Sequence, residues 1–208
     1  MRSSLMIVGA FIVGCLCGYA DLLPEWLKEG DVAMWVLYAL MLQVGIGIGS
    51  DSRLKEILRS LSPKLLLLPC ATIIGTLGAS LIVSFLLSRW SVAEVLAAGS
   101  GMGYYSLSSI LVTSLKESTI GAAAAAELGT ITLMANVMRE MFTLLLAPLM
   151  VRWFSPAAPI CAGGATTIDV TFPVITRYSG TEWAFVAIVH GVIVDFSVPF
   201  LVSFFCSL

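Results

Sequence analysis

The residues best suited to chemistry are two acids, Asp169 and Glu140, that lie in apolar stretches of the chain. Asp169 ends the run Gly163-Gly164-Ala165-Thr166-Thr167-Ile168-Asp169, and Glu140 directly follows Arg139. A bare carboxylate in hydrocarbon costs about 2.5 kcal/mol or more, so it is retained where it faces a cavity, a partner or a cargo. These two acids therefore predict a binding site for a cationic ligand in apolar surroundings.

A second polar region is the run Gly99-Ser100-Gly101-Met102-Gly103-Tyr104-Tyr105-Ser106-Leu107-Ser108, in which glycines alternate before hydroxyl groups. A glycine costs about 1 kcal/mol in a helix interior, so we expect a helix to break here. The break frees N–H groups at the start of a half-helix, and these groups suit a carboxylate. The alternative is close helix packing through small residues. The candidate positions in the two runs are Gly101, Gly103, Tyr104, Ser106, Ser108, Thr166 and Thr167.

Further polar residues lie in the apolar stretch 120–151. At about 100° per residue, Asn136, Arg139 and Glu140 share one stripe of a helix, which must face protein. Either Arg139 holds Glu140 ionised or Asn136 orients both partners, and the alternative is a buried ion pair that fixes helix register. Glu127 is a weaker candidate, since it lies on the opposite side, about 20 Å away and near a helix end.

The last apolar segment carries His190 and Asp195, which lie about 140° apart on an ideal helix and so do not pair with each other. A histidine within a membrane can relay protons, and the alternative for His190 is a helix-packing role. The role of Asp195 is left open, with the lining of an exit path as one candidate.

The composition indicates the solvent that surrounds these groups: 59% of the 208 residues are hydrophobic, 12% are charged, and the mean hydropathy is +1.00. A spanning helix needs about 20 residues. We predict an all-α integral membrane fold, a single transmembrane transporter domain over residues 1–208. Five spanning helices are expected, together with two interrupted or re-entrant segments at 92–115 and 157–178. The net charge of −2 suggests no nucleic-acid partner.

The basic residues orient the chain. Arg53, Lys55, Arg59 and Lys64 crowd one short loop, whereas the loop 21–31 is mostly acidic. The positive-inside rule places the first loop in the cytoplasm, so the N-terminus is cytoplasmic and the C-terminus lies outside. Charge does not decide whether the interrupted segments span or re-enter. Their richness in Gly, Ser and Thr favours re-entry.

No metal or cofactor is expected. The five cysteines, among them Cys15 and Cys17, form no Cys-x-x-Cys pair and lie in apolar runs. An enzyme is not expected either, because no Gly-x-Ser-x-Gly motif frames Ser106 or Ser108, although Asp169 and His190 are present.

The motifs described above, in the order they occur, are similar to those of the LysO family of bacterial lysine exporters. They are Gly101 to Ser108, then Arg139-Glu140, then Gly163 to Asp169 with Pro173, and Val189-His190-Gly191. The resemblance implies export of L-lysine and close analogues across the bacterial cytoplasmic (inner) membrane. It also implies coupling to protons or cations by antiport. The essential acids of the family correspond to Glu140 and Asp169.

Full-length members of that family carry about three more spans ahead of the similar region. The resemblance therefore implies a small membrane subunit that supplies those helices, or a homo-oligomer. Protonation of Asp169 or Glu140 would weaken binding of a cation, which couples cargo release to proton entry. The alternatives are a cation-selective channel and an exporter of another cationic amino acid, since the residues by themselves do not identify lysine.

Overall fold

The computed structural model describes residues 63–208 and isolated positions between 13 and 46, and all elements in 63–208 are helical. The first two apolar segments, 5–20 and 32–49, are expected to span the membrane, and most of their residues lie outside the described part of the chain. The elements are α5 (Pro63–Ser84), α6 (Val92–Gly99), α7 (Tyr105–Ile120), α8 (Ala122–Trp153), α9 (Ala158–Gly163), η1 (Gly164–Ile168), α10 (Phe172–Ser179), η2 (Thr181–Trp183) and α11 (Ala184–Cys206). The expectation of an all-α fold is confirmed for this part of the chain.

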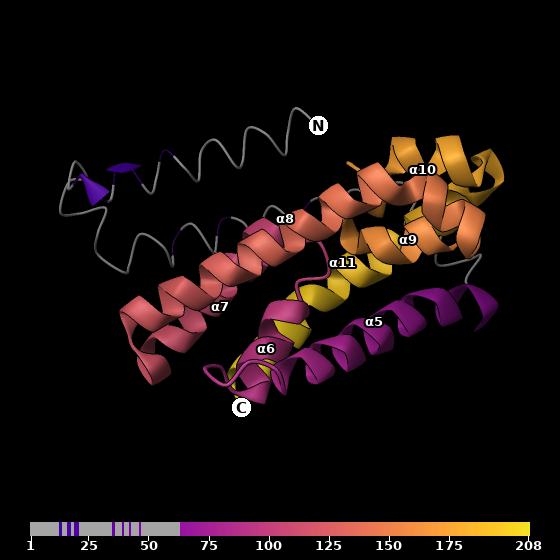
Figure 1. The fold of residues 1–208 in the computed structure, drawn as a ribbon. Coiled ribbons are helices and arrows are strands. Elements are labelled where there is room, and N and C mark those ends of the chain that lie inside the picture. The colour runs from indigo at the N-terminus through magenta and orange to yellow at the C-terminus, as the bar shows by residue number, and fades with distance from the viewer. Residues whose placement is uncertain are drawn as a thin grey trace.

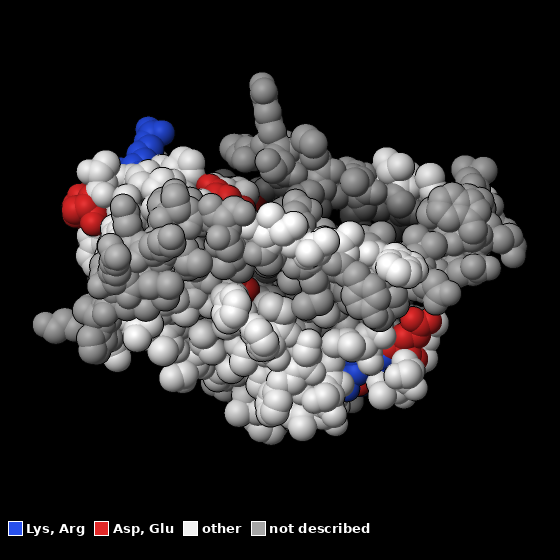
Figure 2. All heavy atoms as spheres, turned by 180° about the vertical axis from the view of Figure 1, so that it is seen from behind, with Lys and Arg blue, Asp and Glu red and all other residues white. Residues whose placement is uncertain are grey.

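Within 63–208, three helices are long and apolar enough to cross a membrane: Leu65–Ser84, Ala122–Trp153 and Thr181–Cys206. They run lengthwise through the molecule, with α6 and α7 towards one end and α9 and α10 towards the other (Figure 1). Among the described residues on the face drawn in Figure 2, charged side chains lie mostly near the two ends, with small acidic areas between them. The chain is a multi-pass membrane protein.

The first broken segment forms a helical hairpin from α6 and α7. Ser91 and Glu94 cap the start of α6 reciprocally, and the helix ends at Gly99. The backbone then turns sharply, with φ of 44° at Met102 and 100° at Gly103, before α7 begins at Tyr105. This confirms the helix break expected at the alternating glycines. Both arms lead to the same end of the molecule. This is indicated by Glu94 of α6 and Lys116 of α7, which each interact electrostatically with Cys206 at the end of α11.

The second broken segment is also a hairpin, made of α9, η1 and α10. Here α9 ends at Gly163, and Gly164 has a φ of 62°. Asp169 follows the short η1, and α10 returns the chain towards the start of α11. Ile160 of α9 and Ile175 of α10 pack in one cluster with Ala187 near the start of α11. The interruption expected between 157 and 178 is therefore present.

The tips of the two hairpins meet beside the middle of α8. The N–H of Ala165 donates to the carbonyl of Met102 at 2.9 Å. Glycine is required at the contact because a Cβ at Gly164 would lie 2.1 Å from the Met102 carbonyl oxygen. One apolar core surrounds the α6–α7 tip, where Met102 and Leu107 pack with the buried face of α11. The joined tips place irregular backbone, with its polar groups, in the interior of an apolar helix bundle.

Candidate functional site

Asn136 on α8 holds the tip of the α6–α7 hairpin. Its Oδ1 accepts from the N–H of Gly103 at 2.8 Å, and its Nδ2 donates to the carbonyls of Ala98 at 3.3 Å and Thr132 at 2.8 Å. The residue is 4% exposed, so these bonds are made away from water. A Cβ on Gly101 would collide with the Asn136 amide and the Ser108 hydroxyl. The polar stripe expected on this helix thus faces protein at Asn136.

Arg139, one turn further along α8, holds the end of α9. Its Nε donates to the carbonyl of Ala162 at 2.8 Å, its Nη2 to the carbonyl of Cys161 at 2.9 Å and its Nη1 to the Thr76 hydroxyl at 3.2 Å. Successive helix residues point in different directions, which separates Arg139 from Glu140. The hydrogen bonds of Arg139 therefore go to α9 and α5. The pairing with Glu140 that we expected from the sequence is not among them.

Three acids and two tyrosines lie close enough to interact electrostatically, and we call Glu140, Asp169 and Asp195 the acidic group. Tyr104 interacts with Asp169 and Asp195, and Tyr105 interacts with Glu140 and Asp169. Asp195 also interacts with Asp169. Glu140 is fully buried, whereas Asp169 is exposed within the structure and accepts from the N–H of Val170. Three separate parts of the chain thus place carboxylates within electrostatic range of the tyrosines at the start of α7.

The hydroxyl groups at the hairpin tips donate to the backbone. Thr166 donates to the carbonyl of Gly163 at 2.9 Å, and Thr167 donates to the carbonyls of Gly164 and Ala187 at 2.9 Å each. Ser108 donates to the carbonyl of Tyr104 at 2.7 Å. These protons hold the hairpins in shape, so they are not available to a ligand in this conformation. Ser106 is half-buried at the first turn of α7.

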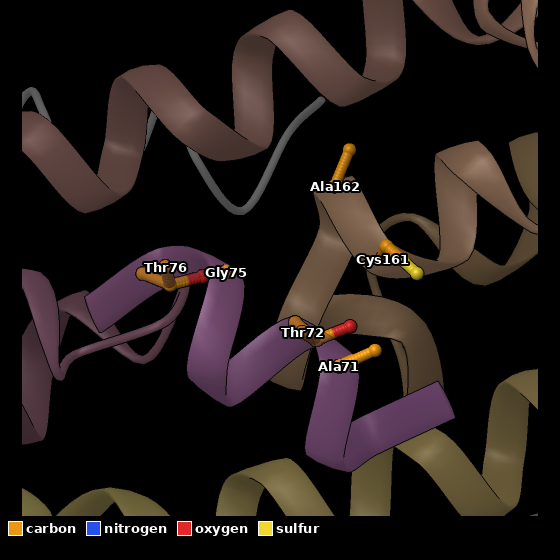
Figure 3. A pocket seen from close by; sticks show the side chains of 6 residues that line it. All are labelled: Ala71, Thr72, Gly75, Thr76, Cys161 and Ala162. Atoms are coloured by element: carbon orange, nitrogen blue, oxygen red, sulfur yellow. The ribbon is translucent and has the colours of Figure 1, made fainter. Parts of the chain in front are cut away.

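An open cleft of about 300 Å³ lies between α5 and α9. Figure 3 shows its lining residues, four on α5 and two on α9, which are Ala71, Thr72, Gly75, Thr76, Cys161 and Ala162. Thr72 bonds Nε2 of the buried His190 at 2.8 Å, which links α5 to α11. In the described part of the chain, Nδ1 of His190 has no hydrogen-bond partner. The cleft therefore lies beside both His190 and Arg139.

Comparison with known proteins places this sequence in a family. The model of the family described as "Lysine exporter LysO" matches residues 8–206. The chain belongs to this family. It is similar to "Lysine exporter LysO" of Escherichia coli (strain K12), with 32% identity over 98% of this chain and 64% of the relative. It is also similar to "Putative lysine exporter" of Haemophilus influenzae, with 31% identity over 97% of each chain. No solved structure matches.

In this LysO family member the candidate residues fall into separate groups. Asn136, Gly101 and Gly103 build the hairpin tip, while Glu140 and Asp169 lie within electrostatic range of Tyr105. Glu127 lies apart from both, because it forms an exposed ion pair with Arg89 near the start of α8. The chain spans about two thirds of the E. coli relative, which fits the expectation that longer members have additional segments.

Sequence reasoning missed Thr72 and Thr76 on α5 and gave no role to Tyr105. Thr72 and Thr76 are one helical turn apart in an apolar helix, so both hydroxyls lie on one face. A search for i, i+4 pairs of small polar residues in spanning segments would have found them.

Proposed function

We propose that this chain is the core of a secondary active exporter of L-lysine and close analogues. The observation that carries the proposal is the meeting of two broken-helix hairpins beside a group of three carboxylates. Backbone without regular hydrogen bonding is tolerated at membrane depth where it is enclosed by protein or borders a water-filled cavity. Interrupted helices that meet near the midplane are the usual construction of transporter binding sites. The lysine exporter names of the two relatives support lysine as the cargo.

The proposed topology follows from the hairpins. Two spans in 1–62 and the three helices α5, α8 and α11 cross the inner membrane, while α6–α7 and α9–α10 re-enter from opposite sides. With a cytoplasmic N-terminus, α6–α7 opens outside and α9–α10 opens to the cytoplasm, and the C-terminus lies outside. Re-entry is supported by the return of both arms of each hairpin to the same end of the bundle.

In the proposed mechanism the acidic group binds the ammonium groups of the cargo. Asp169 is the primary ligand because it is exposed within the structure, and Glu140 and Asp195 lie near enough to add to the negative potential. A proton or cation that enters from outside neutralises Asp169 and releases the cargo. Electrostatic attraction to a carboxylate in an apolar site is strong, so protonation changes cargo affinity in the direction that export requires.

A partner is part of the proposal. The chain covers 64% of the E. coli relative, so we propose that a small membrane subunit supplies about three helices, or that two copies of the chain complete each other. Blue-native electrophoresis of gently solubilised membranes distinguishes these cases from a monomer. A monomer that transports lysine at the full rate would contradict the partner.

The function is tested by counterflow of radiolabelled lysine. Detergent extracts of the source membranes, with the chain overproduced, are reconstituted so that any partner is retained. Wild-type extracts should exchange internal for external lysine and accelerate when a pH or cation gradient is imposed. Asp169→Asn should abolish counterflow while inserting normally, with Glu182→Gln, which changes an exposed acid in η2, as the control.

Three results would reject parts of this assignment. Electrodiffusive flux without counterflow indicates a cation-selective channel. Preferred exchange of arginine or ornithine indicates another cationic amino acid as cargo. Full counterflow by Asp169→Asn would show that the Asp169 carboxylate is not required for transport.

A further inference from the structure

The guanidinium of Arg139 carries a charge that no carboxylate of the described residues balances. Its three hydrogen bonds go to two backbone carbonyls and one hydroxyl, all of them neutral. The ion pair formed between described residues is that of Arg89 and Glu127, at the far end of α8. A cation among apolar helices is expensive to keep without an anion. The guanidinium of Arg139 therefore favours binding of an anion.

Arg139 also has unused donors. A guanidinium has five N–H groups in a planar fork, and the three bonds to Ala162, Cys161 and Thr76 use one each on Nε, Nη1 and Nη2. One N–H on Nη1 and one on Nη2 are left. Each of these N–H groups can donate a hydrogen bond to a carboxylate oxygen.

The cleft between α5 and α9 shares three residues with the contacts of the guanidinium. Three of its lining residues, Thr76, Cys161 and Ala162, are the ones that hold the guanidinium. Thr72, one turn away on α5, adds a second hydroxyl at the cleft. When the His190 tautomer carries its hydrogen on Nε2, that N–H donates to Thr72, and the hydroxyl proton of Thr72 is free to donate to a ligand. The cleft volume of about 300 Å³ lies within the range of small-molecule sites.

We propose that this cleft is the subsite for the α-carboxylate of the amino-acid cargo, bound by Arg139, Thr72 and Thr76. The inference rests on the proposed function and adds the group that distinguishes an amino acid from a simple diamine. The hydroxyls of Thr166, Thr167 and Ser108 do not take this part, because their protons already hold the hairpin tips. The acidic group then binds only the ammonium groups. The two opposite charges of the zwitterion are therefore bound by different parts of the structure.

A purely structural role for Arg139 makes a different prediction. A basic side chain on the last carbonyls of a helix is a common cap and interacts favourably with the helix dipole. Such a cap accounts for the bonds to Cys161 and Ala162. If Arg139 were only a helix cap, loss of the cargo's carboxylate would not change its binding. Loss of the Thr72 hydroxyl would not change transport either.

The test measures how well three unlabelled compounds compete with labelled lysine in the reconstituted wild-type membranes. They are lysine, lysinamide, which lacks the carboxylate charge, and 1,5-diaminopentane, which lacks the carboxyl group. Hydrogen bonds to charged groups predict that both analogues compete about 10- to 100-fold less well than lysine. Equal competition by lysinamide, with lysine counterflow intact, overturns the carboxylate subsite and leaves the proposed function standing. Absence of lysine counterflow overturns both.

Two conservative variants test the hydroxyls without replacing Arg139, whose loss would also remove its bonds to α9. Thr72→Val and Thr76→Val keep the shape of the side chains. Each should raise the KM for lysine about 5-fold or more, while the inhibition constant of 1,5-diaminopentane stays unchanged. Thr130→Val is the matched control, since the Thr130 hydroxyl is exposed and bonds only to the carbonyl of Ala126. A KM for lysine that is the same in all three variants overturns the assignment of the hydroxyls. A uniform loss for lysine and diamine alike shows a structural role and overturns it as well.

Discussion

Replacing Gly164 by alanine should separate the two hairpin tips. The residue has φ 62° and ψ −127°, a region that residues with a Cβ rarely adopt, at a cost of about 1–3 kcal/mol. The new Cβ would also lie 2.1 Å from the carbonyl oxygen of Met102, which is backbone and has little freedom to move. The hydrogen bond from Ala165 to that carbonyl is then lost, at about 0.5–1.5 kcal/mol. The expected destabilisation is therefore about 2–4 kcal/mol.

Thermal unfolding in detergent measures this effect. For chains of about this length, 1 kcal/mol moves Tm by about 2–4 °C, so Gly164→Ala should lower Tm by about 4–16 °C. Lysine counterflow should be lost when the same variant is reconstituted into membranes. The matched control is Gly78→Ala in α5, where a Cβ meets nothing within 4 Å and helix propensity improves by about 1 kcal/mol. An unchanged Tm for Gly164→Ala, together with normal transport, would refute the tip contact as a structural requirement.

Three further changes test other contacts. Asn136→Ala leaves the buried N–H of Gly103 without its acceptor and should cost about 1–3 kcal/mol, seen as a lower Tm, and an unchanged melting curve would contradict the role given to this amide. Glu127→Gln removes an exposed ion pair with Arg89 and should change stability by about 1 kcal/mol or less without altering lysine counterflow. Loss of transport in this variant would indicate that Glu127 belongs to the transport site. Thr167→Val removes the hydroxyl that joins η1 to α11 and should expose the hairpin to limited proteolysis, whereas a wild-type cleavage rate would argue against that link.

The helix breaks were predictable because their cause is local. Alternating glycines at 99, 101 and 103 and paired glycines at 163 and 164 weaken a helix whatever surrounds it, and the structure breaks both segments there. The burial of Asn136 and Glu140 was predictable for a similar reason, since a polar residue in an apolar helix must avoid lipid.

The partners of these residues were not predictable from the sequence because they come from distant helices. Thr76 meets Arg139 across 63 positions and Thr72 meets His190 across 118 positions, and neither spacing leaves a trace in the local pattern. Sequence order also suggested a pairing of Arg139 with Glu140. A helix turns by about 100° between neighbours, so residues that are adjacent in the chain serve different surfaces of α8.

The two hairpins are held by the same face of α8 through bonds of different strength. Asn136 binds the α6–α7 tip through neutral hydrogen bonds, each contributing about 0.5–1.5 kcal/mol, whereas Arg139 binds α9 through charge-assisted bonds of about 1.5–3 kcal/mol each. Because Asn136 and Arg139 lie three residues apart on α8, displacement of either tip acts on the same turn of that helix. An anion bound to the remaining N–H groups of Arg139 would interact with the same guanidinium that holds the α9 carbonyls. Occupancy of the cleft and the position of the α9–α10 hairpin are thereby linked through one side chain.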